Sequence, residues 1–198
     1  MERDADRTRE TILAAAEGVF AEYGFDASTM KAIGDAAGLS RGAAAYFFGS
    51  KSELYDAVLA RVIERARRAM LGAYAHAAPA ASVEDAVATY VGSLLAFLAS
   101  DYAFLRLIQR EALADATRVA DLFGKPVEDA LAAFAVPAER AGVSAQRLLL
   151  DVIALCWYPF AHEHTLLPAL GMHPRDPAFL EDHKQHIVRM VTGLSTTA

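Results

Sequence analysis

Apolar residues recur at roughly every third or fourth position along most of this chain, which is the spacing of one face of an α-helix. In the first such stretch Ile12, Ala16, Val19, Phe20 and Tyr23 share a face, and a stop signal, a glycine, follows at position 24. The same spacing predicts further helices over 28–37, 50–70, 82–98, 100–113, 127–141, 144–157 and 176–194. The predicted fold class is therefore all-α.

Local signals mark where several of these helices begin. Ser50-x-x-Glu53 has the pattern of a capping box, which places the start of the long helix over 50–70. Asp176 followed by Pro177 combines a cap with a first-turn proline and predicts the start of the last helix. Three interruptions are expected: a terminal arm over residues 1–6, a bend or break at Pro137, and a loop over 166–176.

Two short helices joined by a tight turn are predicted between positions 28 and 49. The first runs over 28–37 and is capped by Ser28 or Thr29, Gly38 gives the turn its backbone freedom, and Ser40 is expected to cap the second helix. Ala44 and Phe48, one turn apart, are expected to point back to the core. This arrangement is a helix-turn-helix, which in other proteins places its second helix in the major groove of DNA.

The residue types on the second helix suit that role. Ala43 and Ala45 keep the helix slim enough for a groove about 12 Å wide and match the methyl group of thymine, whereas Arg41 suits guanine. Tyr46 and Lys51 are expected to donate to phosphate oxygens. These residues predict a DNA-reading element.

The spacing Gly-Leu-Ser-Arg-Gly-x-x-x-Tyr-x-Phe-x-Ser-Lys-x-x-Leu, from Gly38 to Leu54, resembles the DNA-binding domain of the TetR/AcrR family of transcriptional regulators. The resemblance extends back to about Arg7. It implies a homodimeric, all-helical repressor with a three-helix helix-turn-helix domain over residues 1–50 and a larger helical effector-binding and dimerisation domain over 51–198. In the family the last two helices form the dimer interface, and the apolar excess over 144–157 agrees with that expectation.

The chain departs from the usual family pattern at three positions of the second helix. Ala44 and Ala45 stand where many relatives carry a bulky aliphatic residue and a tyrosine, and Phe47 stands where a histidine often touches phosphate. Phosphate binding is therefore expected to depend more on the other polar residues. The complete predicted DNA-binding set is Ser28, Thr29, Lys31, Ser40, Arg41, Gly42, Ala43, Ala45, Tyr46, Phe47 and Lys51.

Composition and charge fit a specific regulator better than a protein that coats nucleic acid. The chain has 198 residues, is 55% hydrophobic, and carries a formal net charge of −6. Between positions 28 and 51, however, Lys31, Arg41 and Lys51 outnumber the single acidic residue Asp35. One cysteine excludes an internal disulfide and suits a reducing cytoplasm, and no apolar run is long enough for a membrane span.

Aromatic and charged residues after position 51 are candidates for contact with a small molecule. The candidate set is Tyr90, Phe97, Phe104, Arg106, Arg110, Trp157, Phe160 and His162. The aromatic members are equally well explained as core, and Arg106, Arg110 and Glu111 as charges that pair with one another. A small molecule bound there would release the DNA, with the helix over 50–70 as a lever; the alternative is that this helix is only a scaffold.

The remaining chemistry is scarce. The spacing of His162, His164, His173, His183 and His186 is not that of a recognised zinc site. No glycine loop for phosphate, nucleophile elbow or paired-carboxylate site is present. We therefore expect no metal, no cofactor and no enzymatic activity, and we expect double-stranded DNA with a palindromic operator as the partner. Two alternatives stay open at this point: a regulator controlled by a protein partner, and a helical enzyme.

Overall fold

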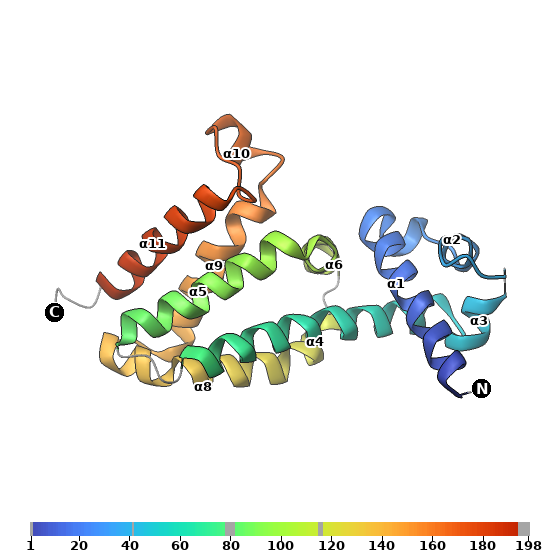
Figure 1. The fold of residues 1–198 in the computed structure, drawn as a ribbon, viewed down its shortest axis with the longest axis horizontal. Helices are drawn as coiled ribbons and strands as arrows, with labels where there is room; N and C mark the ends of the chain where they lie inside the picture. The colour runs from blue at the N-terminus through green and yellow to red at the C-terminus, as the bar shows by residue number, and fades with distance from the viewer. Residues whose placement is uncertain (1, 41, 78–81, 115–116, 194–198) are drawn as a thin grey trace. The chain divides into compact units, whose positions relative to one another are not determined.

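The computed structural model describes residues 2–40, 42–77, 82–114 and 117–193, and every regular element in these ranges is helical (Figure 1). The elements are α1 (Glu2–Ala27), α2 (Met30–Ala36), α3 (Ala43–Phe48), α4 (Lys51–Ala77), α5 (Val83–Ser100), α6 (Tyr102–Leu113), α7 (Thr117–Ala120), the 3₁₀ turn η1 (Asp121–Phe123), α8 (Gly124–Ala141), α9 (Ala145–Ala161), α10 (Leu166–Ala169) and α11 (Pro177–Gly193). The prediction of an all-α fold is confirmed.

The chain divides into two compact units. Unit 1 comprises Met1–Glu64 and Tyr102–Leu122, and unit 2 comprises Arg65–Asp101 and Phe123–Ala198. The long helix α4 therefore contributes its first half to unit 1 and its second half to unit 2. The boundary at residue 50 that the sequence suggests for a DNA-binding domain stays a prediction.

Unit 1 is built around α1, which packs against α2 and α6 (Figure 1). Ile12, Ala16 and Phe20 on α1 are fully buried, as their spacing predicts. Tyr23 shares their face but is 63% exposed, so its predicted burial is wrong. The spacing of apolar residues shows which face of a helix a residue lies on, but not whether another helix covers that face. Tyr23 lies next to Gly24, where the backbone leaves the helical conformation (φ 79°).

Three of the predicted interruptions differ from the structure. Residues 2–6 belong to α1 and are not an extended arm, which fits the intrahelical bond from Thr8 Oγ1 to the Asp4 carbonyl. Helix α8 runs through Pro137 without the predicted break, since proline removes only one backbone donor, and the alternative of a bend there stays a prediction. The predicted loop over 166–176 contains the short helix α10, whose Leu167 is buried.

Unit 2 is organised around α5, which packs against α8, α9 and α11. Val91, Leu95 and Leu98 on α5 are buried, and the Tyr90 ring meets the Phe134 ring of α8 edge to face at 4.7 Å. Ser82 caps α5 and Ser144 caps α9 through side-chain bonds to Asp85 N and Arg147 N. Among the described helices, no single one is both long and apolar enough to cross a membrane; α5 and α6 reach that composition only when taken together.

Candidate nucleic-acid interface

The turn between α2 and α3 is fixed by backbone bonds that the sequence makes possible. Gly38 has φ 67°, a conformation that favours glycine, and its amide donates to the Asp35 carbonyl at 3.1 Å. The amide of Leu39 donates to the Gly34 carbonyl at 3.0 Å. At the other end of α2 the Thr29 hydroxyl accepts from the Ala32 amide, so Thr29 is the cap. The helix-turn-helix geometry therefore follows from local residues.

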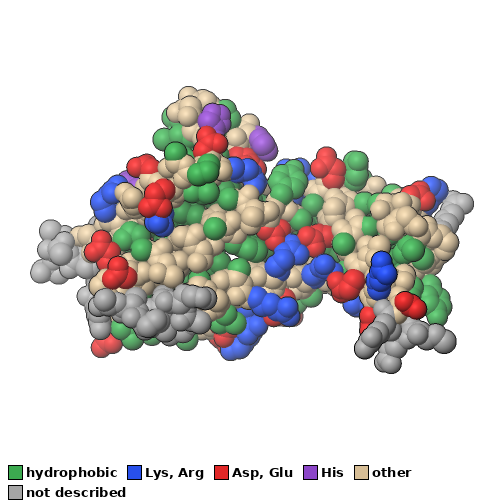
Figure 2. Space-filling view, in the orientation of Figure 1, with side chains coloured by type: hydrophobic (Ala, Val, Ile, Leu, Met, Phe, Trp, Pro, Cys, Tyr) green, Lys and Arg blue, Asp and Glu red, His purple; other side chains and the backbone are tan. Residues whose placement is uncertain are grey.

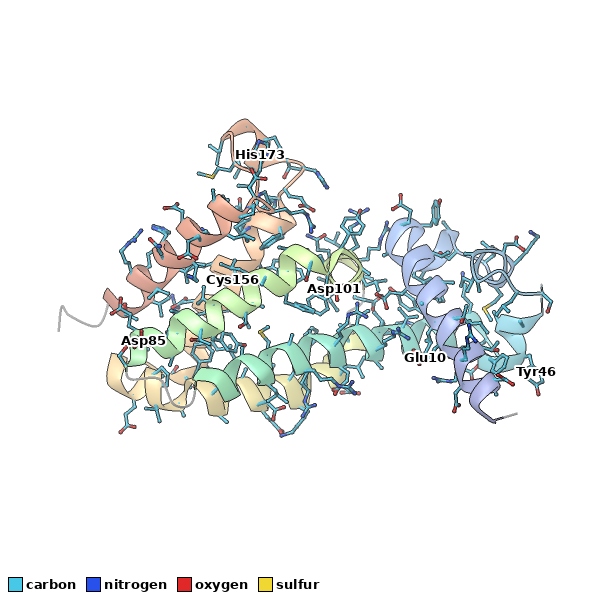
Figure 3. The ribbon with its side chains drawn as sticks, viewed as in Figure 1. Glu10, Tyr46, Asp85, Asp101, Cys156 and His173 are labelled. Atoms are coloured by element: carbon cyan, nitrogen blue, oxygen red, sulfur yellow. The ribbon has the colours of Figure 1, made fainter. Side chains whose placement is uncertain are left out.

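Helix α3 has a buried side and an outer side. Ala44 is fully buried and Phe48 is 8% exposed, which confirms that these two residues point to the core. On the other side Ala45 is exposed and Tyr46 is 85% exposed, while Ala43 and Phe47 are half-buried. Figure 3 labels Tyr46 at the outer edge of α3. The helix is anchored by its inner residues and presents the others outward.

The start of α3 differs from the prediction. The cap residue is Gly42, which makes no side-chain cap bond, and the Ser40 carbonyl accepts from the Ala43 amide at 2.9 Å. The prediction that the Ser40 side chain caps the helix is therefore wrong, because the helix begins three residues after Ser40. The Ser40 side chain is exposed. Arg41, the predicted guanine reader, lies outside the described residues.

Two members of the predicted DNA-binding set are engaged inside unit 1. Ser28 is 2% exposed, and its hydroxyl donates to the Gly24 carbonyl at 2.5 Å. The Lys51 ammonium donates to the carbonyls of Phe25 and Ser28 at 2.9 and 3.1 Å and lies 4.3 Å from the centre of the Phe25 ring. Both side chains therefore hold the connection between α1 and α2 in place. Because it is buried, Ser28 is not part of the exposed surface of the helix-turn-helix.

The polar residues of α2 remain at the surface. Thr29 and Lys31 are exposed, and the Lys31 ammonium lies 2.5 Å from a carboxylate oxygen of Asp35 one turn away. An exposed pair of this kind contributes little to stability, so the ammonium can exchange the carboxylate for another anion at small cost. Thr29, Lys31, Ser40 and Tyr46 are thus exposed polar residues on the two helices and their turn.

A capping box connects α3 to α4, as predicted. The Ser50 amide donates to Glu53 Oε2 at 2.9 Å, and the Glu53 amide donates to Ser50 Oγ at 3.2 Å. The Ser50 hydroxyl also donates to Glu53 Oε2 at 2.7 Å, and this bond, together with the one from the Ser50 amide, lowers the pKa of the Glu53 carboxyl. Gly49 has a φ of 70°, which favours glycine, and a Cβ there would lie 2.7 Å from Glu53 Oε2, so that a larger residue would also displace the capping carboxylate.

Helix α6 is joined to α1 and α4 by polar contacts that the sequence does not predict. The Tyr55 hydroxyl donates to Glu111 Oε1 at 2.7 Å, and the Arg110 Nη2 donates to the Glu22 carbonyl at 2.9 Å. A Cβ at Gly24 would lie 2.9 Å from the Arg110 Nη1. The pKa of the Tyr55 hydroxyl is raised, mainly because the side chain is buried and to a lesser extent because of its bond to Glu111. Arg110 and Glu111 therefore bond to other helices, and the expectation that they pair with each other is wrong.

The arginines along α4 are held by carboxylates. Figure 2 shows basic side chains along the middle of this helix with acidic ones next to them. Arg61 lies 2.5 Å from Glu10, Arg65 lies 2.5 Å from Asp101, and Arg67 lies 2.8 Å from Asp129. Arg61, Arg65 and Arg67 are thus committed to contacts within the chain.

The predicted effector residues fall into both units. Tyr90, Phe97 and Phe160 are buried in unit 2, while Trp157 and His162 are half-buried there. Phe104, Arg106 and Arg110 belong to α6 in unit 1. The Nε atoms of Arg106 and Arg110 are buried without a hydrogen-bond partner among the described residues. The role of these residues toward an effector stays a prediction.

Cysteine and histidine chemistry is limited in the described residues. Cys156 is fully buried, and burial raises the pKa of its thiol to about 12 (Figure 3). Among the described residues no group of three or more histidine, cysteine or acidic side chains could hold a metal ion. The His183 Nε2 lies 3.0 Å from the Leu155 carbonyl, which gives this histidine a structural bond between α11 and α9.

Comparison with known proteins agrees with this geometry. Residues 12–58 match the family described as bacterial regulatory proteins, tetR family, and residues 84–191 match a tetracyclin repressor-like C-terminal domain. Over 58 residues the chain is 41% identical to the HTH-type transcriptional repressor BepR of Brucella suis biovar 1 (strain 1330); this match covers 29% of the chain and 28% of that repressor.

Solved structures share the fold over almost the whole chain. A TetR family transcription regulator from Marinobacter aquaeolei VT8 has a TM-score of 0.75 at 15% identity, covering 95% of this chain and 97% of its own. A TetR-family regulator from Mesorhizobium loti MAFF303099 has a TM-score of 0.72 at 20% identity, covering 96% and 97%. The regulator FadR from Bacillus subtilis, in complex with stearoyl-CoA, has a TM-score of 0.70 at 13% identity, covering 94% and 98%.

A helix-turn-helix with an outward second helix, joined to a larger helical region, defines a DNA-binding transcriptional regulator rather than an enzyme. The C-terminal match alone spans more than half of the chain. The chain belongs to the TetR family of bacterial transcriptional regulators.

Proposed function

We propose that this regulator is a homodimeric repressor that places one α3 from each subunit into a palindromic operator and is released from it by a small molecule. The observation that carries the proposal is the two-sided character of α3. Ala44 and Phe48 anchor it, and Ala45 and Tyr46 stand outward. In helix-turn-helix dimers the two reading helices lie about 34 Å apart, one turn of DNA, and a palindrome reflects the two-fold symmetry.

The contacts divide into two kinds. Thr29, Lys31, Ser40 and Tyr46 are exposed polar side chains that suit phosphate oxygens, and these contacts position the protein without reading sequence. The part that approaches base edges consists of the cap residue Gly42 and of Ala43, Ala45 and Phe47 on α3. Arg41 keeps its predicted place among the base-reading residues. Lys51 supports the surface from within, through the carbonyls of Phe25 and Ser28.

Exposed apolar residues on α9 and α11 support dimerisation through these helices. Leu150 is 59% exposed and Ile153 is 41% exposed on one side of α9, and Met190 on the adjacent α11 is 41% exposed. Leu150, Ile153 and Trp157 follow one another at helical spacing. Large apolar side chains exposed at helical spacing are costly in water and are typical of a protein interface.

An effector bound in unit 2 would act through α4, since this helix contributes to both units. The apolar interior around α5, including Tyr90 and Phe97, suits an apolar or aromatic molecule. The FadR neighbour, which has the same fold, holds stearoyl-CoA. A coupling free energy of about 1 to 3 kcal/mol between the two sites would give a useful response.

Fluorescence anisotropy with DNA tests this function directly. The purified full chain is titrated into labelled duplexes that tile the DNA flanking its own gene, at several salt concentrations. We expect one duplex to bind with high affinity, and the logarithm of its binding constant should fall linearly with the logarithm of the salt concentration. Only the same duplex without the label should compete for binding. Mass spectrometry of the same preparation identifies any co-purified small molecule. Equal affinity for every duplex would contradict the proposal.

A further inference from the structure

We propose that the residues of α3 itself, Ala43–Phe48, read the operator through the C5-methyl groups of pyrimidines, that is, through apolar contacts, while hydrogen bonds to base edges fall to Arg41 before the helix. This inference rests on the proposed function, because it names what the same surface recognises. It concerns an apolar reading face that we define as Ala43, Ala45 and Phe47, beside Tyr46, whose hydroxyl is the phosphate contact proposed above.

The first step is the chemistry of that face. Ala45 is exposed, Ala43 and Phe47 are half-buried, and none of the three carries a side-chain donor or acceptor. Tyr46, at 85% exposure, brings one hydroxyl at the end of an aromatic ring. No amide or carboxylate side chain stands on α3, and these are the groups that read adenine and cytosine directly.

The second step is the arrangement of the two aromatic rings. The Tyr46 and Phe47 rings meet edge to face, with centroids 5.2 Å apart and planes at 86°. This contact couples the orientation of the two rings. The apolar surface of α3 therefore contains the Phe47 ring as well as the methyl groups of the two alanines. The reading face is thus a mixed aliphatic and aromatic surface and not merely a row of small residues.

The third step is how close this face can approach DNA. Ala44 is fully buried and Phe48 is 8% exposed, so the depth and rotation of α3 are fixed by the core of unit 1. Alanine side chains let the helix backbone come near the floor of the major groove. At that distance the apolar group that a base pair offers is the C5-methyl of thymine, and apolar side chains are its usual partners.

The experiment removes single methyl groups from DNA. The full chain first selects a duplex from a random-sequence double-stranded library, and each thymine of the selected half-site is then replaced by uracil, which lacks only the methyl group. We expect at least one replacement to weaken binding about fourfold, and about fifteenfold when made in both half-sites, as for burial of one methylene-sized group each. A second pair of duplexes carries cytosine or 5-methylcytosine at that position. The duplex with 5-methylcytosine should bind more tightly than the one with cytosine, because the methyl group is present again.

A protein variant assigns the effect to α3. In Ala45→Gly or Ala43→Gly the ratio of thymine to uracil affinities should fall toward one, because the protein methyl that meets the DNA methyl is gone. If a glycine variant does not fold, Ala45→Ser is used instead; it replaces the apolar methyl by a polar hydroxymethyl group and should lower the same ratio. The matched control is Ala14→Gly, an exposed alanine of α1, which should keep the wild-type ratio.

The outcomes separate the inference from the function on which it rests. Methyl reading is overturned if every uracil replacement leaves the affinity within twofold of that of the selected duplex. It is also overturned if the selected half-site contains no thymine. Either outcome leaves the DNA-binding function intact. An unchanged ratio in all the α3 variants overturns it too. Failure to enrich any sequence overturns both.

Discussion

The hydroxyl of Tyr55 on α4 donates a 2.7 Å hydrogen bond to Glu111 Oε1 on α6, across 56 positions of sequence. Tyr55 is 1% exposed and Glu111 is 6% exposed. A buried carboxyl group that loses its partner is destabilising, so this bond holds α6 against the first half of α4 within unit 1. The Arg110 bond to the Glu22 carbonyl holds the same helix to α1.

Tyr55→Phe removes only the hydroxyl and leaves Glu111 without this donor. We expect the free energy of unfolding to fall by about 1 to 3 kcal/mol, the cost of leaving a buried polar group unsatisfied. Urea denaturation followed by circular dichroism measures it. Tyr23→Phe, at a position that is 63% exposed, is the control and should change stability by less than about 0.5 kcal/mol. Equal stability of the two variants would contradict this role of the bond.

Lys51→Met distinguishes the two roles of this lysine. The Lys51 ammonium donates to the carbonyls of Phe25 and Ser28. If this is its role, the free energy of unfolding of the variant should fall by about 1 to 3 kcal/mol, as expected for the loss of hydrogen bonds from a charged group. The slope of log K against log salt for DNA binding then stays unchanged. If Lys51 instead neutralised a phosphate, as its sequence position suggests, the slope would fall in magnitude by about 0.9.

Ser50→Ala should lower the melting temperature in a pH-dependent way. The pKa of Glu53 is below its ordinary value of 4.5 in the folded state, because the Ser50 side chain and backbone donate to the carboxylate. A lowered pKa means that this stabilisation is present above the unfolded-state pKa and is lost as the pH falls through the folded-state pKa. The difference between wild type and variant should therefore be largest near neutral pH and shrink in acid. A difference that grows in acid would refute the assignment.

Leu150→Glu should produce monomers. It places a charge at a position that is 59% exposed on the proposed α9 and α11 interface, where a second subunit would bury it without a partner. Light scattering after gel filtration measures the mass. Val136→Glu, at 54% exposure on α8, is the matched control and should stay dimeric. Loss of dimer in both variants, or in neither, would count against this interface.

Cys156 should not react with a thiol reagent while the chain is folded. Its side chain is fully buried, and burial raises its pKa to about 12, so little thiolate exists near neutral pH. Ellman's reagent at pH 8 should report no thiol in the native protein and one after unfolding in guanidinium chloride, because the chain has one cysteine. Rapid reaction of the native protein would contradict the buried position.

Features that depend on near neighbours in sequence could be predicted. The capping box of Ser50 and Glu53 and the inward side of α3 both depend on residues within one or two turns. The start of α3 was predicted wrongly from Ser40, because glycine is also accepted at the cap position and the structure uses Gly42.

Features that depend on distant residues could not be predicted. Lys51 resembles a phosphate-binding residue by its position, but its partners lie 26 and 23 residues earlier in the chain. Glu111 could be identified as a charge beside core positions, but nothing in the local pattern indicates that Tyr55 would meet it. In both cases the contact is decided by the packing of helices that are far apart in sequence.

The most direct measurement of the central claim is the affinity of a Tyr46→Ala variant for the selected operator, by fluorescence anisotropy. Tyr23→Ala, another exposed tyrosine of unit 1, is the comparison. If the outer side of α3 contacts DNA, Tyr46→Ala should bind about tenfold or more weakly, which corresponds to about 1.4 kcal/mol, and Tyr23→Ala should bind as the wild type does. Equal operator affinity for wild type and Tyr46→Ala, with both folded, would contradict the claim.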